Sequence, residues 1–193
     1  MNQKHDKETI IAKGQALFRE RGYHDTGVNE ILKSCEISKG VFYNYFSTKE
    51  DFLLQTVAYY SAYTDAFIER HTTNKALPPL ERLRSLYNAL MEIAEAENCQ
   101  KGCLVYNLSF EVAGKNDEVA KVLDDHFEHW VNLVATCIKE GQDRGEIAIA
   151  HSAHHLASIL HTSFNGAYGR VKAQRSTAPM KQIVDTMLEM ITL

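Results

Sequence analysis

The sequence predicts an all-α protein, with a small three-helix unit at the N-terminus and a larger helical bundle after it, about nine helices in total. Prolines are scarce, with three in 193 residues, so long helices can run without interruption. Apolar side chains also recur at spacings of three and four residues, which is the period of an amphipathic helix.

The first four predicted helices follow one another closely. Gly22 ends the first, because glycine tolerates the positive φ that stops a helix. Thr26 is expected to cap the second and Ser38 the third, and the box Ser47-Thr48-Lys49-Glu50 is expected to open the fourth. These helices are predicted at about 6–21, 27–34, 39–45 and 48–71.

The rest of the chain predicts five more helices, separated by prolines, glycines and short polar breaks. They are expected at about 78–98, 103–112, 117–143, 152–174 and 178–191. We therefore expect two domains, an N-terminal one over residues 1–48 and a C-terminal one over residues 49–193.

Composition narrows the class of protein. No apolar run approaches the roughly 18 residues that span a membrane, and the polar first residues resemble no secretory signal. Four scattered cysteines are too few for a disulfide framework, so a reducing cytoplasm is expected. The net charge of −4 resides in residues 56–193, since residues 1–55 hold eight basic and eight acidic side chains. A neutral N-terminal part tolerates nucleic-acid binding without proving it.

The segment from Thr26 to Lys49 has the spacing of a helix-turn-helix, with two short helices joined by the three-residue turn at 36–38. Its apolar residues are predicted to face a three-helix core, while Lys39, Tyr43 and Asn44 face solvent. Such polar side chains on a short second helix suit hydrogen bonds to DNA phosphates and base edges. The alternative is a helical hairpin that contacts protein.

This segment resembles the DNA-binding domain of the TetR family of regulators. The matching positions are Thr26, Val28, Ile31, Ile37, Ser38, Lys39, Gly40, Phe42, Tyr43, Tyr45, Phe46, Lys49 and Glu50. The leading residues Ala16, Phe18, Arg21, Gly22 and Tyr23 fit the family's first helix and its exit. The resemblance implies a dimeric regulator, most simply a repressor released from its operator by a small molecule.

The same resemblance implies a set of DNA-contacting residues. They are Thr26, Asn29, Lys39, Gly40, Tyr43, Asn44, Tyr45 and Lys49. Position 45 is often His in the family and position 29 often Arg, so the departures at Tyr45 and Asn29 leave the operator sequence open.

The C-terminal part holds the mixture of aromatic and polar side chains expected around a small-molecule effector, although each one alone is more typical of plain core. The candidate lining residues are Tyr106, Asn107, Phe110, Trp130, His161, Phe164, Asn165 and Tyr168, with Tyr87, Met91 and Phe127 beside them.

A further hypothesis concerns Cys103, which follows Lys101-Gly102 at a predicted helix start, where the helix dipole and a cation favour the thiolate. Gly102-Cys103-Leu104 resembles a TetR subgroup that includes the repressor of N-ethylmaleimide reductase, which responds to electrophiles through a cysteine and a lysine. The similar run 166–172 would place that lysine at Lys172. The competing interpretation is a buried structural cysteine, and a Cys99–Cys103 disulfide stays open.

Histidines at 126 and 129, and at 151, 154 and 155, invite a metal site, but no third ligand is fixed, so we expect no metal and no cofactor. We also find no Ser-His-Asp pattern or phosphate-binding glycine loop, so an enzyme using Cys103 or the histidines is the weaker alternative.

The expected partners are a palindromic double-stranded operator, an effector and a second copy of the chain. Helices 152–174 and 178–192 carry small and apolar residues at helical spacing, and the resemblance implies that they pair with their symmetry mates in a C₂ dimer. An activator, or a regulator that stays on DNA with its ligand, remains an alternative to a repressor.

Overall fold

The computed structural model describes residues 6–193, and the regular structure in that range is helical apart from one isolated β-bridge between Ile147 and Thr192. The elements are α1 (Lys7–Arg21), α2 (Val28–Cys35), α3 (Lys39–Tyr45), α4 (Lys49–Thr72), α5 (Pro79–Ala96), α6 (Leu104–Glu111), the 3₁₀ turn η1 (Ala113–Lys115), α7 (Asp117–Asp143), α8 (Ala153–Gly166), α9 (Tyr168–Gln174) and α10 (Ala178–Ile191). The all-α prediction is confirmed.

The predicted helix at 152–174 is two helices, α8 and α9. The Ala167 N–H is shared between the carbonyls of Ser163 and Phe164, each at 3.2 Å, which tightens the last turn of α8 and starts a new helix. The described range therefore holds ten α-helices where the sequence predicted about nine.

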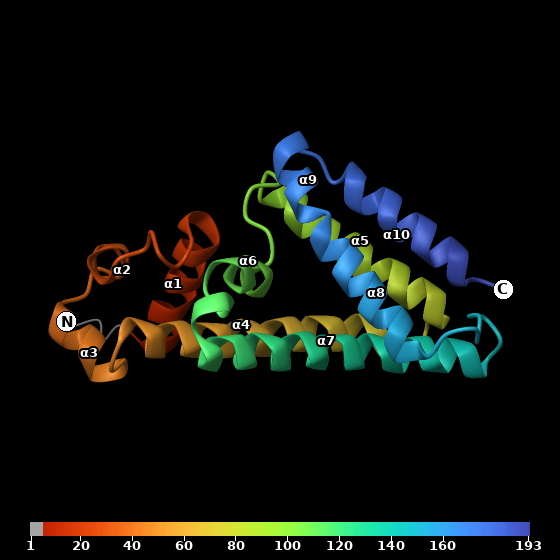
Figure 1. Cartoon of the computed structure of the whole chain (residues 1–193), viewed down its shortest axis with the longest axis horizontal. Helices are drawn as coiled ribbons and strands as arrows, with labels where there is room; N and C mark the ends of the chain where they lie inside the picture. The colour runs from red at the N-terminus through yellow and green to blue at the C-terminus, as the bar shows by residue number, and fades with distance from the viewer. Residues whose placement is uncertain (1–5) are drawn as a thin grey trace. The chain divides into compact units, whose positions relative to one another are not determined.

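The chain divides into two compact units, here called unit 1 (residues 6–63 and 103–126) and unit 2 (residues 64–102 and 127–193). Unit 1 holds α1, α2, α3, α6 and the first parts of α4 and α7. Unit 2 holds α5, α8, α9, α10 and the remainders of α4 and α7, with α10 packed against α5 and α8 (Figure 1). Unit 1 thus draws α6 and the start of α7 from beyond residue 48.

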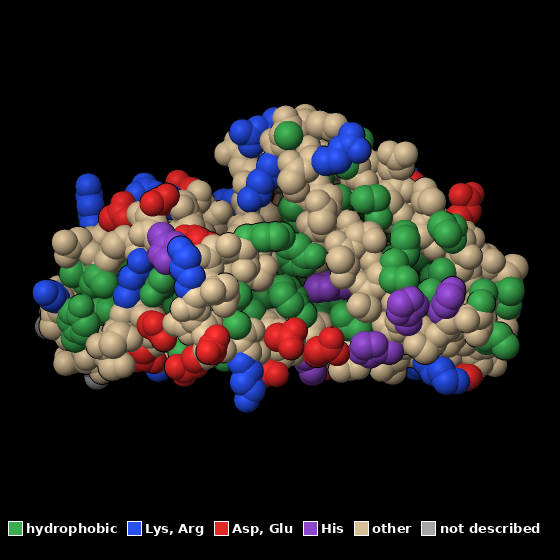
Figure 2. Space-filling view, viewed as in Figure 1, with side chains coloured by type: hydrophobic (Ala, Val, Ile, Leu, Met, Phe, Trp, Pro, Cys, Tyr) green, Lys and Arg blue, Asp and Glu red, His purple; other side chains and the backbone are tan. Residues whose placement is uncertain are grey.

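The start of α7 gives unit 1 an acidic face. Figure 2 shows acidic side chains gathered where this helix begins, and the exposed residues there are Asp117, Glu118, Asp124 and Asp125. Such a face repels phosphate, so any nucleic acid that binds unit 1 must approach from another side.

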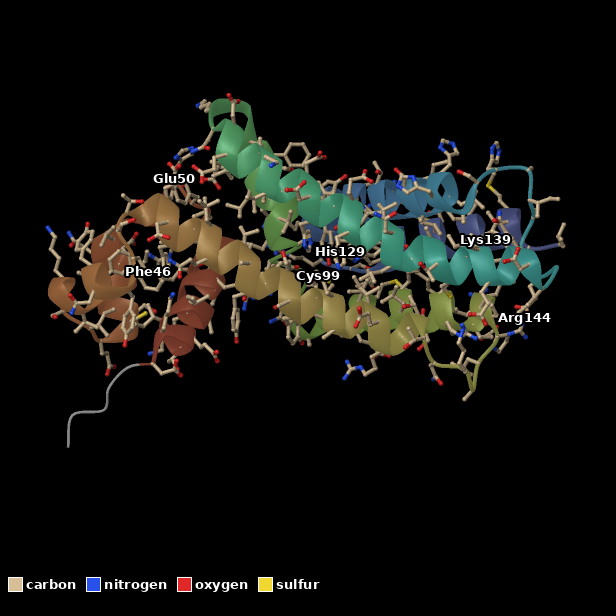
Figure 3. All side chains as sticks on the ribbon, turned by 90° about the horizontal axis from the view of Figure 1, so that it is seen from below. Phe46, Glu50, Cys99, His129, Lys139 and Arg144 are labelled. Carbon is tan, nitrogen blue, oxygen red and sulfur yellow. The ribbon has the colours of Figure 1, made fainter. Side chains whose placement is uncertain are left out.

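The core of unit 1 contains a cluster of fully buried aromatic rings. Phe42 lies with its ring centroid 5.1 Å from that of Phe46 and 5.4 Å from that of Phe52, and Figure 3 shows Phe46 turned inward among α1, α3 and α4. Gly14 on α1 lets Phe52 come close, because a Cβ at that position would overlap its ring. These contacts fix α3 against α1 and α4.

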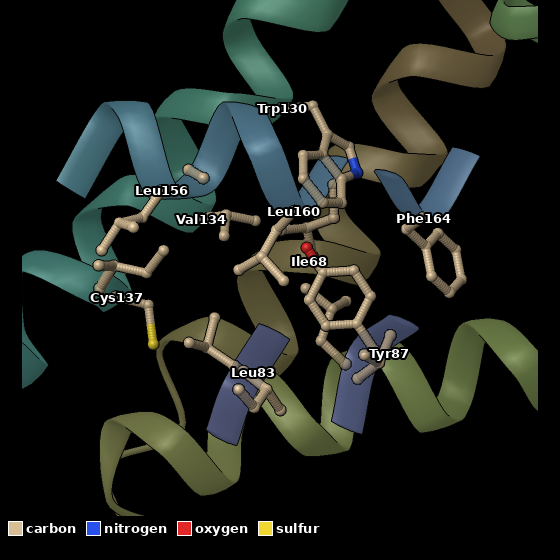
Figure 4. Close-up of a cluster of buried hydrophobic side chains, with 14 of the residues drawn as sticks. Ile68, Leu83, Tyr87, Trp130, Val134, Cys137, Leu156, Leu160 and Phe164 are labelled. Atoms are coloured by element: carbon tan, nitrogen blue, oxygen red, sulfur yellow. The ribbon is translucent and has the colours of Figure 1, made fainter. Parts of the chain in front are cut away.

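Unit 2 has a larger apolar core drawn from α4, α5, α7, α8 and α10. Leu83, Leu86, Val134 and Leu160 have no exposed surface, and Figure 4 shows several of these side chains meeting between the helices. Within residues 6–193, every helix is too short or too polar to span a bilayer.

An ion pair between the buried Arg82 and the partly exposed Glu140 ties α5 to α7 in unit 2. The Arg82 side chain is 1% exposed and donates to both Glu140 carboxylate oxygens, at 2.8 and 3.0 Å. It also donates to the carbonyls of Leu77 and Thr72, so a guanidinium removed from water is well paired. The hydrogen bond from Arg82, and a second from Lys75, lower the pKa of Glu140 to about 2.

Two of the predicted helix caps are displaced by one residue. Gly27, not Thr26, is the N-cap of α2, and Glu30 reaches back to the Gly27 N–H at 2.9 Å. At α4 the Thr48 hydroxyl accepts from the Asp51 N–H at 2.9 Å, and Asp51 accepts from the Ser47 N–H. The hydroxyl that caps α4 is therefore that of Thr48, one residue after the predicted Ser47. Ser47–Glu50 and Thr48–Asp51 have the same spacing, so the sequence alone could not distinguish them.

Candidate DNA-binding interface and effector region

Helix α3 presents a polar face to solvent and an aromatic face to the core. Ser38 caps it by accepting from the Val41 N–H at 3.3 Å, and Phe42 buries its whole side chain. Tyr43 on the opposite side is 44% exposed, with the Lys39 ammonium 5.8 Å from its ring centroid. Along with Tyr43, the exposed predicted contacts are Asn29, Lys39, Gly40 and Asn44, and Tyr45 is half-buried.

Gly40 stands on this exposed face with almost no protein around it. A Cβ there would meet only the Ser38 hydroxyl, at 3.8 Å. Folding therefore does not require glycine at position 40, whereas a backbone that approaches DNA closely does benefit from the missing side chain.

Thr26 and Lys49 are placed differently from the other predicted contacts, because both have partners inside unit 1. Thr26 is fully buried and its hydroxyl donates to the Gly22 carbonyl at 2.7 Å. The Lys49 ammonium donates to the Tyr23 carbonyl at 2.6 Å and lies 4.0 Å from the Tyr23 ring centroid. Burial lowers the pKa of Lys49, and Glu111 and Glu30 oppose that shift.

Both backbone polar groups of Tyr23 are hydrogen-bonded to side chains, one from α6 and one from α4. Its N–H donates to Glu111 at the end of α6, at 2.9 Å, and the next N–H, of His24, donates to the other oxygen of the same carboxylate. The Lys49 ammonium, on α4, donates to the Tyr23 carbonyl. Gly22 has φ +90°, and a Cβ there would press on the Glu111 carboxylate. This arrangement, here called the Tyr23 clamp, fixes the α1–α2 loop that positions the start of α2.

The predicted effector residues fall into both units. Cys103, Tyr106, Asn107 and Phe110 belong to unit 1, and Trp130, His161, Phe164, Asn165, Tyr168 and Lys172 belong to unit 2. Phe110 is 84% exposed, with its ring centroid 5.8 Å from that of Tyr106.

Cys103 is the N-cap of α6 and is half-buried, whereas Cys35, Cys99 and Cys137 are buried; all four are free thiols. The Tyr60 hydroxyl donates to the Cys103 sulfur at 3.6 Å. Burial, and then the nearby Cys103, raise the pKa of Tyr106. Tyr60 was missing from the sequence-based set, since α4 and α6 are 43 residues apart at this contact.

In unit 2 the predicted aromatic and polar side chains form one buried cluster. The His161 ring centroid lies 4.4 Å from that of Trp130 and 5.4 Å from that of Phe127, and Asn165 donates to the His161 carbonyl. Tyr87 packs with its ring centroid 5.1 Å from that of Phe164 and is fully buried, yet its hydroxyl has no hydrogen-bond partner within residues 6–193.

A surface cleft of about 590 Å³ lies elsewhere in unit 2, between the end of α5 and the segment before α10. Its walls include Cys99 and Arg175, both at positive φ, and Thr177, whose hydroxyl donates to Glu95. None of the predicted effector residues lines this cleft.

The histidines form pairs with other residues. His154 lies 3.1 Å from Glu128, His129 lies 3.4 Å from Asp65, and the His126 ring contacts the Ser61 hydroxyl at 2.8 Å. Among residues 6–193, no three His, Cys, Asp or Glu side chains are grouped so that they could hold a metal ion.

A solvent-facing, base-compatible α3 held on a three-helix core, joined to a larger helical unit, defines a helix-turn-helix DNA-binding regulator. Residues 10–56 match the family described as bacterial regulatory proteins of the tetR family, and residues 79–187 match the tetracyclin repressor-like C-terminal domain. The chain belongs to the TetR family of transcriptional regulators and is not an enzyme.

Relatives and solved structures agree with that assignment. The chain is 32% identical to the HTH-type transcriptional repressor DhaR of Mycobacterium sp. (strain GP1), covering 95% of this chain and 90% of DhaR. It is 26% identical to the repressor NemR of Escherichia coli (strain K12), over 92% and 89%. The crystal structure of regulatory protein TetR from Rhodobacter sphaeroides superposes with a TM-score of 0.91 at 30% identity, covering 96% and 98%.

Proposed function

We propose that this TetR-family repressor binds a palindromic operator as a homodimer through α2 and α3, and that an effector releases it. The α3 surface supports this most directly, because it exposes Lys39, Tyr43 and Asn44 and carries no acidic residue. Lysine and tyrosine suit phosphate contacts, and an asparagine amide can pair with both the N6 and N7 of adenine.

The predicted contacts then have two kinds of role. Asn29, Lys39, Gly40, Tyr43, Asn44 and Tyr45 face or approach the DNA. Thr26 and Lys49 act as positioning residues, because their polar atoms hold the α1–α2 loop.

Titration of labelled DNA from the chain's own upstream intergenic region tests this role. Lys39→Ala should weaken binding and flatten its dependence on salt, because each lost phosphate contact lowers the slope of log K against log[salt] by about 0.9. Lys121→Ala, an exposed lysine near the acidic start of α7, is the matched control. Equal loss in both variants would contradict the assignment of the surface.

The dimer is proposed to form through the segments 152–174 and 178–192. Supporting residues on α8 and α10 are the exposed Thr162, Gly166, Thr186 and Met190, the last with 75% of its surface exposed. Small and apolar side chains exposed on a helix suit close packing against a symmetry mate. Light scattering of wild type and Gly166→Arg would show a dimer and a monomer, respectively.

The Tyr23 clamp offers a route for release. It joins the end of α6 directly to the loop before α2, so a shift of α6 displaces the α2 start. Because an effector can act only through different affinity for two conformations, the effector must favour the one in which this loop has moved.

Two observations support electrophiles as one effector class. Cys103 is the cysteine that is not buried, and the Tyr60 hydroxyl donates to its sulfur. Lys172, in unit 2, stays a predicted partner. Addition of a quinone to the repressor–DNA complex should release DNA from wild type and not from Cys103→Ser. Release from both would mean that the quinone does not act through Cys103.

A further inference from the structure

The Tyr87 hydroxyl is a hydrogen-bonding group buried without a partner. The residue has no exposed surface, and no described protein atom pairs with its oxygen. Leaving such a group unpaired costs the folded state the hydration that the group had in the unfolded chain. A phenylalanine would keep the contacts of the ring without that cost, so the packing of the ring does not call for a hydroxyl.

The surroundings of this hydroxyl are apolar. Figure 4 shows it directed from α5 toward Ile68, Leu160 and Trp130. The Tyr87 ring centroid lies 6.2 Å from that of Trp130 and 5.1 Å from that of Phe164. Burial raises the pKa of Tyr87, so the group stays neutral and can donate a hydrogen bond.

A second buried oxygen without a partner belongs to a residue of α4, the helix that also carries Ile68. Asp65 on α4 is one turn before Ile68, and its Oδ1 is buried without a partner while Oδ2 lies 3.4 Å from His129. His129 in turn precedes Trp130. In residues 6–193, Asp65 Oδ1 and the Tyr87 hydroxyl are the two buried side-chain polar atoms without a hydrogen-bond partner. Both belong to unit 2.

We propose that Tyr87 is the polar anchor of an effector site in unit 2, which takes a neutral, mainly apolar small molecule with one hydrogen-bond-accepting oxygen, such as a ketone. The buried cluster that contains Tyr87 also holds Ile68, Leu83, Trp130, Leu160 and Phe164. A charged ligand is excluded by these apolar side chains, since an unpaired charge among them would be far costlier than an unpaired hydroxyl. This inference rests on the proposed release of the repressor by an effector.

The experiment compares two probes of nearly equal shape, cyclohexanone and methylenecyclohexane, in which a C=CH₂ group replaces C=O. Trp130 is the chain's single tryptophan, so its fluorescence reports directly on ligand entry beside Tyr87. Both probes are titrated into full-length wild type, Tyr87→Phe and the control Tyr63→Phe, whose ring is 63% exposed. Thermal unfolding of each ligand-free protein is measured in parallel.

The ratio of ketone affinity to alkene affinity should be about five- to tenfold higher in wild type and Tyr63→Phe than in Tyr87→Phe, the value of one hydrogen bond. Tyr87→Phe should favour the alkene, because there the ketone loses its hydration and gains no partner. Ligand-free Tyr87→Phe should also melt about 2–4 °C higher, because it lacks the unpaired group. Stability gained with selectivity lost is a combination that a structural hydroxyl would not produce.

The same ratio of ketone to alkene affinity in wild type and Tyr87→Phe, or no fluorescence response to either probe, would overturn the proposal. So would a ketone preference that survives in Tyr87→Phe, or a loss of stability in that variant, which would mean that the hydroxyl has a structural partner such as water. Operator binding without probe is measured separately, so failure of the repressor function is distinguished from failure of this site.

Discussion

The two units differ in how completely their buried polar groups are paired. In unit 1 the buried hydroxyls of Thr26 and Thr56 donate to carbonyls one turn back, and both sides of the Tyr23 peptide are held. In the described part of unit 2, Tyr87 and Asp65 each leave one buried oxygen unpaired. Unit 1, which carries α3, is thus preorganised, whereas unit 2 keeps the buried Tyr87 hydroxyl, a donor that the accepting oxygen of a ligand can satisfy.

The largest loss of stability is expected on removing the Arg82 side chain, whose buried guanidinium donates four hydrogen bonds in unit 2. Arg82→Ala should lower the free energy of unfolding by about 3 kcal/mol, because it removes a buried side chain and its four hydrogen bonds. Urea titration measures the change. Arg84→Ala, which breaks the more exposed pair with Asp185, is the control and should cost much less, because solvent screens that pair. Similar losses in both variants would show that the buried Arg82 guanidinium and its partners add little.

Gly40→Ala should separate folding from DNA binding in unit 1. The new methyl group meets no backbone and alanine favours a helix, so the melting temperature should stay the same or rise slightly. Operator affinity should fall about tenfold, because the methyl group projects from the surface that must approach DNA. Unchanged affinity in a DNA titration would mean that α3 does not dock closely at position 40.

Glu111→Gln should weaken the link between α6 and the α1–α2 loop. The amide keeps the shape but offers one accepting oxygen to the N–H groups of Tyr23 and His24, where the carboxylate offers two. We expect the ratio of operator affinities without and with effector to shrink about three- to tenfold. Glu118→Gln on the exposed start of α7 should keep the wild-type ratio. An unchanged ratio in Glu111→Gln would remove the Tyr23 clamp from the release route.

The smallest expected effect is on how the free energy of unfolding depends on pH. The pKa of Glu140 is about 2 in the folded protein and near its usual 4.5 in the unfolded chain, so the unfolded chain binds the proton first. The stabilisation from this group is present above pH 4.5 and is lost as the pH falls toward 2. Unfolding followed from pH 6 to pH 2.5 should therefore show a shallower acid dependence in Glu140→Gln. Identical slopes would contradict the low pKa.

Local signals in the sequence predicted much of unit 1. The glycine at 22, the cap at Ser38 and the apolar positions of α3 are short-range features, and the structure confirms each of them. Long-range contacts were beyond such signals. Nothing near Glu111 indicates that its carboxylate receives N–H groups 87 and 88 residues earlier.

The predicted effector residues illustrate the same limit. The aromatic and polar composition around Trp130 and Phe164 predicted the lining of an effector pocket, which stays a prediction, and the structure brings those two rings to Tyr87. Which of several buried polar groups lacks a partner depends on the packing of four helices and could not be deduced from residue types. The internal partners of Thr26 and Lys49 were hidden for the same reason.

The central claim is that this repressor reads DNA through α3 and releases it on effector binding. The most direct measurement is fluorescence anisotropy of its upstream intergenic DNA across a salt series, repeated with cyclohexanone and with a quinone. The account predicts tight binding that weakens steeply with salt and is relieved by at least one of the two compounds. Absence of specific binding at any salt concentration, or binding that neither compound changes, would contradict it.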